Sequence, residues 1–162
     1  MIHIGIDVGV TGAIAALQNG VYLDLQDLPI NTSGKAKWVQ GGGLLQILHD
    51  MRGVPQPTMV TVEATHAMPG NGSVAAHSQG MTLGSVLAVL DIAGMAYELV
   101  QPAVWKRELG LQGKGLTDTQ RKAAALNMAR QRFPGAPLER QKDHNRAEAI
   151  LIAHYAQRRW KT

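Results

Sequence analysis

Short runs in which apolar and other residues alternate open the chain and predict a meander of β-strands. Isoleucines take every second position over residues 2–7, and further strand patterns follow at 13–17 and 21–26. Asn19-Gly20, between the second and third of these runs, is a strong signal for a tight hairpin turn. Residues 29–43 are rich in glycine, serine, threonine and lysine, and this composition predicts a loop.

The rest of the chain predicts two more strands and mostly helix. A short helix is expected over residues 44–51, and a strand over 59–63. Ser73 is expected to cap a long helix that runs to about residue 94, before a buried strand at 96–100. Three further helices are expected at 103–109, 117–133 and 143–159. Five strands with helices packed on them indicate a single α/β domain over residues 1–162, built on a layered sheet.

Two of the predicted strands end in a lone carboxylate. Asp7 ends the first strand and Glu63 ends the strand over 59–63. A buried carboxylate is costly unless hydrogen bonds or a metal ion neutralise it. A turn-initiating aspartate before Gly9 is the simpler interpretation of Asp7 taken alone. If the two strands are parallel neighbours, both carboxylates lie at the carboxyl edge of the sheet, where open α/β sheets place their chemistry.

A third acidic feature lies near the C-terminus. Glu148 stands in the first turns of an otherwise apolar helix, beside the small residues Ala147 and Ala149. Small neighbours allow such a helix to press against the sheet, which would direct Glu148 towards Asp7 and Glu63. Clustered carboxylates repel one another unless cations lie between them, and clusters of oxygen ligands prefer Mg²⁺ or Mn²⁺. Two such ions about 4 Å apart support phosphodiester hydrolysis.

The residues before Glu148 offer several candidates for a further ligand. Asp143 lies roughly 140° from Glu148 around an ideal helix, so it points inward only from the N-cap position. His144 and Asn145 share the helix face of Glu148. A plain N-cap is the alternative interpretation of Asp143.

Charge is divided unevenly along the chain, whose formal net charge is +4. Up to Val100 there are three basic and seven acidic residues, whereas from Gln101 onward there are thirteen basic and five acidic ones. A basic half joined to an acidic, strand-rich half favours a polyanion-binding enzyme, and nucleic acid is the obvious polyanion. Solvated helix faces with surplus lysine and arginine are the alternative. The chain has no cysteine, no signal-peptide pattern and no long apolar run, so we expect a cytoplasmic protein without disulfides.

Several short motifs, in order and at matching spacings, resemble those of RuvC-type Holliday junction resolvases, with the greatest resemblance to the branch encoded by phages and prophages. They are Gly5-Ile-Asp-Val-Gly-Val-Thr-Gly12, Val62-Glu63, Ser78-Gln79-Gly80, Val104-Trp-Lys106 and Arg146-Ala-Glu-Ala-Ile-Leu-Ile-Ala153. The resemblance covers nearly the whole chain. It implies a ribonuclease-H-like fold with a five-stranded mixed sheet flanked by helices. It also implies four metal-binding acidic positions, a homodimer, and Mg²⁺-dependent nicking of four-way DNA junctions.

The resemblance assigns the metal-binding acids residue by residue. Asp7, Glu63 and Glu148 match the first, second and last acids of the family, each with a catalytic role. Family members commonly have an aspartate where this chain has Asn145, so we expect Asp143 to be the fourth carboxylate, with His144 as the rival ligand. Two Mg²⁺ ions are implied in each active site, with Mn²⁺ as a substitute.

The resemblance also points to residues that contact DNA. The family often carries an aromatic residue after the second acid, where this chain has His66 and Met68. Either can wedge against a base step, and a loop histidine and methionine without a role in binding are the alternative. Lys106 matches the family's basic position and is the first candidate for a phosphate contact. The other candidates are Arg107, Lys114, Arg121 and Lys122. Small residues in the helix over 81–94 are expected to form the dimer interface.

The sequence thus predicts a Mg²⁺-dependent endonuclease that resolves Holliday junctions and other branched DNA by paired symmetric nicks. We expect a homodimer that acts in the cytoplasm, a bacterial host's if a phage encodes it, without a membrane or a small-molecule cofactor. A related nuclease that acts on structured RNA is the first alternative. The glycine turn after Asp7 also resembles the phosphate turn of actin-like ATPases, but this chain has room for only one of their two subdomains. A junction-binding protein without catalysis is the remaining alternative, suggested by Asn145.

Overall fold

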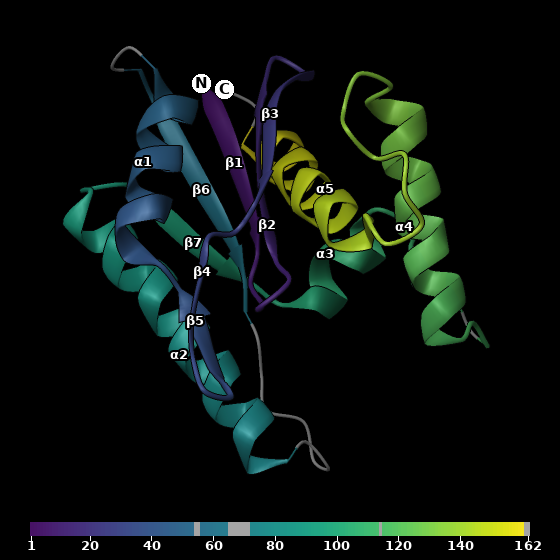
Figure 1. Cartoon of the computed structure of the whole chain (residues 1–162). Coiled ribbons are helices and arrows are strands. Elements are labelled where there is room, and N and C mark those ends of the chain that lie inside the picture. Colours follow the sequence, from purple (N-terminus) through teal and green to yellow (C-terminus); the bar gives the residue numbers. More distant parts are fainter. Residues whose placement is uncertain (54–55, 65–71, 114, 161–162) are drawn as a thin grey trace.

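A mixed five-stranded sheet forms the centre of the molecule (Figure 1). The computed structural model describes residues 1–53, 56–64, 72–113 and 115–160. The strand order across the sheet is β3-β2-β1-β6-β7. The strands are β1 (Ile2–Asp7), β2 (Ala13–Gln18), β3 (Val21–Asp27), β6 (Thr58–Glu63) and β7 (Tyr97–Val100). The α/β sheet expected from the sequence is therefore confirmed.

The first three strands form an antiparallel meander, and the last two run parallel to β1. β1 pairs antiparallel with β2, and β2 pairs antiparallel with β3. Asn19 and Gly20 join β2 to β3 with φ angles of 52° and 79°, the left-handed conformation that a tight two-residue hairpin requires. β6 lies parallel to β1 on its other side, and β7 lies parallel to β6. The carboxyl ends of β1 and β6 therefore meet at one edge of the sheet.

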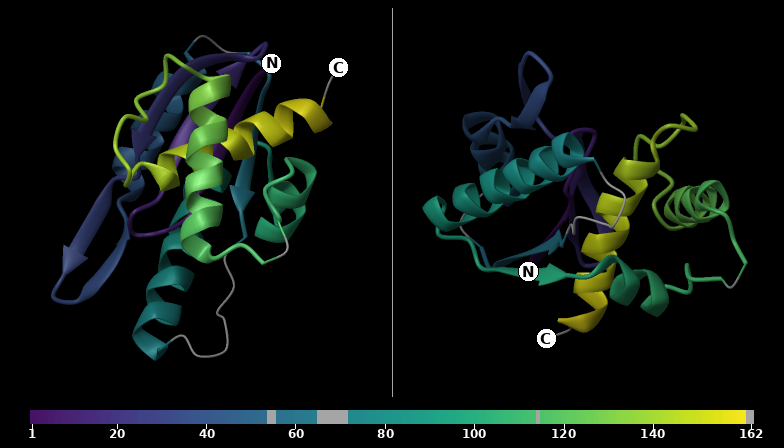
Figure 2. Two further views of the ribbon diagram at one scale, coloured as in Figure 1. Left: turned by 90° about the vertical axis from the view of Figure 1, so that its right-hand side faces the viewer. Right: turned by 90° about the horizontal axis from the view of Figure 1, so that it is seen from below.

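Helices cover both faces of the sheet (Figure 2). On one face lie α1 (Gly41–Arg52) and α2 (Ser73–Ile92), and on the other lies α5 (His144–Arg159). Beyond α5 an outer layer is formed by α4 (Asp118–Arg132), while the short α3 (Pro102–Glu108) packs near α5. No helix in the described ranges combines the length and the apolar character that crossing a membrane requires.

The sheet separates two hydrophobic cores, and the alternation along each strand decides which core a residue joins. Ile2, Ile4 and Ile6 of β1 face the core under α1 and α2. Ala13, Ala15 and Leu17 of β2 join the core formed with α3, α4 and α5. Because neighbouring residues of a strand point to opposite faces, two short strands supply both cores.

The helix α5 lies directly against β1 because the facing residues are small. A Cβ atom at Gly5 would overlap the carbonyl oxygen of Ala149 and the amide nitrogen of Ala153. The backbones of strand and helix are therefore in contact at this point. This arrangement confirms the expectation that small residues around Glu148 let its helix press against the sheet.

The segment expected to be a loop over residues 29–43 contains a β-hairpin instead. The hairpin consists of β4 (Ile30–Ser33) and β5 (Ala36–Val39), joined at Gly34, whose φ is 58°. Its outer half is polar and exposed, so it lacks the apolar alternation that marks a strand. Packing of β5 against α2, which the sequence pattern does not display, supports the hairpin.

Two helix starts also differ from the sequence predictions. α1 begins at Gly41 rather than at residue 44, because Leu44, Leu48 and Met51 bury one face of a helix that extends through the preceding glycines. Gly72 takes the N-cap position of α2, and Ser73 is its first helical residue. The helix expected over 117–133 is confirmed, since α4 spans Asp118–Arg132. Its N-cap, Thr117, forms a reciprocal capping box with Gln120.

The substitution Gly5→Ala tests the contact between β1 and α5. We expect it to lower the free energy of unfolding by about 1–3 kcal/mol, since the new methyl group must push the helix away from the strand. Urea denaturation followed by circular dichroism measures this change. Gly42→Ala in α1 is the control, because open space surrounds a Cβ there. An unchanged stability of Gly5→Ala would show that the close contact is not required.

Candidate active site

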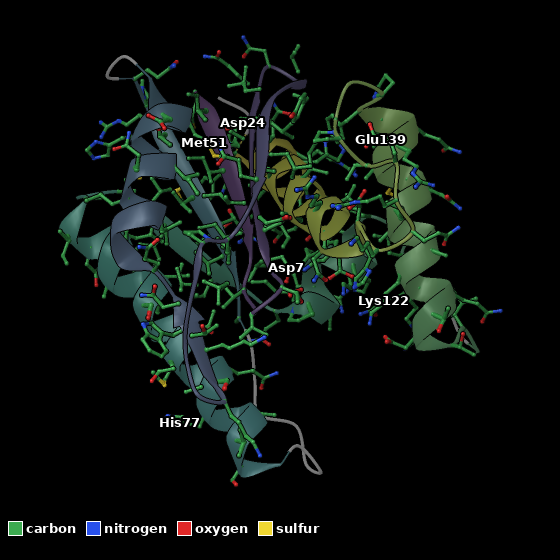
Figure 3. The ribbon with its side chains drawn as sticks, in the orientation of Figure 1. Asp7, Asp24, Met51, His77, Lys122 and Glu139 are labelled. Atoms are coloured by element: carbon green, nitrogen blue, oxygen red, sulfur yellow. The ribbon has the colours of Figure 1, made fainter. Side chains whose placement is uncertain are left out.

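Three acidic side chains meet at the carboxyl edge of the sheet. One carboxylate oxygen from each of Asp7, Glu63 and Glu148 lies within 4.8 Å of the others. All three residues are nearly buried, with exposed fractions of 8%, 7% and 9%. Figure 3 shows Asp7 at this edge, near the first turns of α5. The structure therefore brings together the three acids that the sequence analysis singled out first.

Strand pairing and helix packing place each acid. In the parallel pair of β1 and β6, Ile6 lies opposite Val62, so that Asp7 and Glu63 end adjacent strands at the same level. Glu148 comes from the first turns of α5, which Gly5 allows to lie on β1. The three carboxylates therefore meet although they are 56 and 85 residues apart along the chain.

A second contact holds the start of α5 against the sheet. Arg146 forms a two-pronged ion pair with Asp27, at the end of β3, with N–O distances of 2.6 and 2.8 Å. The guanidinium holds the pKa of the Asp27 carboxyl below its usual value, mainly through these hydrogen bonds. Paired hydrogen bonds of this kind also fix orientation, so the first turn of α5 is held in direction as well as in position.

Burial and mutual repulsion disfavour the charged forms of these acids. Burial raises the pKa of the Asp7 carboxyl well above its usual range, and the charges of Glu63 and Glu148 raise it further. Burial and the charge of Glu148 likewise raise the pKa of Glu63. The cluster therefore resists full ionisation until positive charge enters it.

Lys106 of α3 supplies a positive charge to the cluster. Its Nζ donates to both oxygens of Glu148, at 3.0 and 2.9 Å, and lies 5.0 Å from the ring centre of Trp105. Although burial opposes its charge, the Glu148 carboxylate raises the pKa of the Lys106 ammonium. One ammonium cannot balance three carboxylates.

The donor set suits a hard divalent cation. Three buried carboxylates offer only oxygen ligands, the type that Mg²⁺ and Mn²⁺ prefer. The raised pKa values of Asp7 and Glu63 also favour cation binding. A cation between the oxygens would remove the repulsion that causes part of the shift. Asp7, Glu63 and Glu148 are therefore the residues that would hold a metal ion.

Asp143, expected to be the fourth carboxylate, is not part of this cluster. It does take the N-cap position of α5, but its side chain turns to Arg140. It accepts hydrogen bonds from the backbone amide and the Nε of Arg140, both at 2.8 Å, and forms an ion pair with the same guanidinium. Although burial opposes its ionisation, these contacts hold the pKa of Asp143 below its usual value. Arg140, three residues earlier, thus holds the carboxylate of Asp143 away from the cluster. The sequence prediction considered the direction of Asp143 on an ideal helix but not the pull of this arginine.

The neighbours of Asp143 also lie outside the carboxylate cluster. Asn145 donates its side-chain amide to the carbonyl and the hydroxyl oxygen of Thr11, at 2.6 and 2.8 Å. His144 is half-buried and lines, with Thr11 and Asn145, a hollow of about 400 Å³ beside the turn between β1 and β2. Asn145 is therefore bound to the turn after β1, while His144 lies beside it at the hollow.

The residues expected to contact DNA have separate locations. Lys106 contacts the carboxylate cluster. The other three described candidates are exposed on α3 and α4, namely Arg107, Arg121 and Lys122. Lys122 also pairs with Asp118 one turn earlier, at 3.1 Å. His66, Met68 and Lys114 lie outside the residues that the structure describes.

Trp105 is the site residue to which the sequence analysis gave no role. Its ring is fully buried and its indole Nε1 donates to Oε1 of Glu63 at 2.8 Å. The one feature of the sequence that pointed to Trp105 was its position next to Lys106, on a helix with buried and exposed faces. That signal did not reveal its partner, because Glu63 lies 42 residues earlier in the chain.

Comparisons with known proteins identify relatives of the chain, although no family model matches it. The sequence is 39% identical over 98 residues to the chloroplastic Holliday junction resolvase MOC1 of Chlamydomonas reinhardtii. That match covers 59% of this chain but only 10% of the relative, so the chain corresponds to a small part of the relative's length.

Solved structures match over the whole chain. Thermus thermophilus RuvC in complex with a Holliday junction substrate superposes with a TM-score of 0.67 at 23% identity. This match covers 100% of this chain and 98% of that one. A second structure of Thermus thermophilus RuvC matches with a TM-score of 0.57 at 22% identity, over 98% and 96% of the two chains. The chain is thus related in sequence to a Holliday junction resolvase and has the ribonuclease-H-like fold of RuvC.

Proposed function

We propose that the protein is a divalent-metal-dependent endonuclease that cleaves branched DNA, with four-way junctions as its main substrate. The observation that carries the proposal is the buried cluster of Asp7, Glu63 and Glu148 at the carboxyl edge of a RuvC-like sheet. The names of the similar proteins support the choice of substrate, since one is a Holliday junction resolvase and another was solved with a Holliday junction.

Asp7, Glu63 and Glu148 would hold Mg²⁺ or Mn²⁺, with two ions in each site. When bound, such ions lower the pKa of a water molecule and stabilise the charge on the leaving oxygen of a phosphodiester. The protein would direct three oxygen ligands towards one point at a nearly buried edge of the sheet. Charges interact more strongly there than in bulk water.

Lys106 is the candidate for contact with the cleaved phosphate. Its side chain retains 25% exposure while its ammonium donates to Glu148, so it lies at the rim of the cluster. A cation at that rim attracts a DNA phosphate to the carboxylates, which would otherwise repel it. In the absence of DNA the same ammonium offsets part of the negative charge of the cluster.

Basic residues beyond the cluster supply a path for the DNA backbone. Arg107 on α3 and Arg121 and Lys122 on α4 are exposed, and Figure 3 shows Lys122 on the helix beside α5, across from Asp7. Charges of this kind position a nucleic acid without reading its sequence. His66, Met68 and Lys114 remain candidates for base and phosphate contacts.

A homodimer would place two such sites on one junction. The helix α2 exposes Val74 and Ile92, with exposed fractions of 64% and 80%, and Cβ atoms at Gly80 and Gly84 would meet no neighbouring group within the described part of the chain. Such a surface allows a second helix to approach closely. Two identical sites related by a twofold axis suit a substrate that is itself nearly twofold symmetric, and they give paired symmetric nicks.

Cleavage of a synthetic mobile four-way junction tests the proposal. We expect paired nicks with Mg²⁺ or Mn²⁺, none in EDTA, and none on a linear duplex of matched sequence. Asp7→Asn and Glu63→Gln should each reduce the rate roughly a thousandfold, the equivalent of about 4 kcal/mol of transition-state stabilisation. Cleavage of structured RNA in preference to the junction would contradict the proposed substrate.

Metal-free stability tests the repulsion within the cluster. In EDTA we expect Asp7→Asn to raise the Tm by a few degrees, at about 2–4 °C per kcal/mol for a chain of this size. The folded state raises the pKa of Asp7, so ionisation of this group costs stability. The gap between variant and wild type should therefore widen as the pH rises from about 4 through the folded pKa.

Differential scanning calorimetry at several pH values measures this gap. Mg²⁺ should then stabilise the wild type and have little effect on the variant, since only a ligand that binds the folded state raises its Tm. A variant less stable than the wild type in EDTA at high pH would contradict the expected repulsion.

Asp143→Asn tests whether three carboxylates suffice. We expect a loss of about 1.5–3 kcal/mol in the free energy of unfolding at neutral pH, because charge-assisted hydrogen bonds to Arg140 are lost. The folded state lowers the pKa of Asp143, so its contribution is present above about pH 4 and disappears as the pH falls through the folded pKa.

The cleavage rate of Asp143→Asn, measured well below its Tm, should stay within a few-fold of the wild type. Asp118→Asn is the matched control, because the ion pair of Asp118 with Lys122 is exposed and contributes little. A rate as low as that of Asp7→Asn, with unchanged stability, would place Asp143 among the metal ligands.

A further inference from the structure

Trp105 makes a hydrogen bond that a purely structural tryptophan does not need. A buried indole N–H requires an acceptor, and a backbone carbonyl satisfies it at small cost. Here the acceptor is Oε1 of Glu63, at 2.8 Å, on a side chain that is itself 7% exposed. Both partners are buried, so water does not compete effectively for either of them.

The geometry around Trp105 links two of the three carboxylates to one short helix. Trp105 binds Glu63 through its indole N–H, and the next residue, Lys106, binds Glu148 through its ammonium. The ammonium also lies 5.0 Å from the centre of the Trp105 ring, within the range of a cation–π interaction. These consecutive residues of α3 thus hold carboxylates from β6 and α5.

We propose that Trp105 is a positioning residue of the metal site, whose indole N–H fixes the carboxylate of Glu63 in the orientation that binds the cation. The inference rests on the proposed function, and deepens it by naming a residue that acts on a metal ligand. With Oε1 held by the indole, Glu63 cannot turn freely about its last side-chain bond. One of its oxygens is thereby kept at the meeting point with Asp7 and Glu148.

The chemistry of the indole explains why a tryptophan suits this position. Indole Nε1–H is a donor only, so it favours the ionised carboxylate, which is the form that binds a cation. It carries no charge, so it does not repel an incoming cation as a second lysine would. Phenylalanine would fill most of the same space without the donor.

The other tryptophan with an assigned partner shows the contrast. The indole of Trp160 donates to Oε1 of Glu98 at 3.2 Å, but Trp160 is 43% exposed and its partner is no member of the cluster. That contact is longer and open to water. The bond of Trp105 is both shorter and buried.

Mn²⁺ binding in the absence of DNA tests the proposal. We expect Trp105→Phe to weaken Mn²⁺ binding by about 10- to 100-fold, the usual effect of removing a hydrogen bond to a metal ligand. Electron paramagnetic resonance of the free ion measures this affinity at a temperature well below the Tm of each variant. A tryptophan that only packs in the core would change the Tm but not the affinity at that temperature.

Tyr155→Phe is the matched control. Tyr155 is also a buried aromatic residue, and its hydroxyl accepts a hydrogen bond from Arg159 at the far end of α5. The variant therefore loses one polar group from a buried ring outside the carboxylate cluster. Its Mn²⁺ affinity should equal that of the wild type.

A second measurement needs no substitution at Trp105. In ¹⁵N-labelled wild-type protein, the indole N–H signal of Trp105 should shift as Mg²⁺ is added, because its acceptor becomes a metal ligand. The indole signals of Trp38 and Trp160 should stay in place, and Trp38→Phe and Trp160→Phe assign them. A Trp105 signal that does not move would contradict the proposal even if Trp105→Phe does not fold.

The outcomes separate the inference from the proposed function. If the wild type binds Mn²⁺ and Trp105→Phe binds it equally well, the positioning role is wrong while the nuclease proposal stands. The same holds if the wild type binds the ion and the indole signal of Trp105 does not shift when Mg²⁺ is added. If the wild type binds no divalent ion, the proposed metal-dependent function fails, and the positioning role fails with it.

Discussion

The contact between β1 and α5 is the constraint on which the candidate site depends. Glu148 can meet Asp7 and Glu63 only if its helix lies directly on the strand that carries Asp7. Gly5 makes this possible, because any side chain there would collide with the backbone of α5. The ion pair between Arg146 and Asp27 then holds the first turn of the helix. The lack of a side chain at Gly5 therefore allows a carboxylate from the other end of the chain to reach the site.

Bringing three carboxylates together has a cost in stability, and the surrounding residues reduce it only in part. Burial and mutual repulsion raise the pKa of Asp7 and Glu63, while Lys106 and Trp105 favour their ionised forms. A site of this kind is poised to take up a cation, since positive charge relieves a repulsion that the fold imposes. Stability is given up at the position where chemistry is proposed, as is common for functional sites.

Local patterns predicted most of the elements because those elements carry strong local signals. The isoleucine alternation of β1, the turn at Asn19-Gly20 and the helical pattern over 117–133 each act over a few residues or turns, and each was found where it was expected. The hairpin of β4 and β5 was missed because its stability comes from packing against α2, and its outer half is polar and exposed.

By itself the sequence determined the kind of sheet, and it determined that Asp7, Glu63 and Glu148 meet. Strand patterns that end in acids, and small residues around Glu148, are enough to predict an edge where carboxylates gather. Only the tertiary structure decided which other groups reach that edge. Trp105 and Lys106 turned to Glu63 and Glu148, each 42 residues away along the chain, whereas Arg140, only three residues before Asp143, kept that carboxylate away from the edge. The physical reason is that a hydrogen-bonding side chain takes the partner nearest to it in space, and chain folding alone sets that distance.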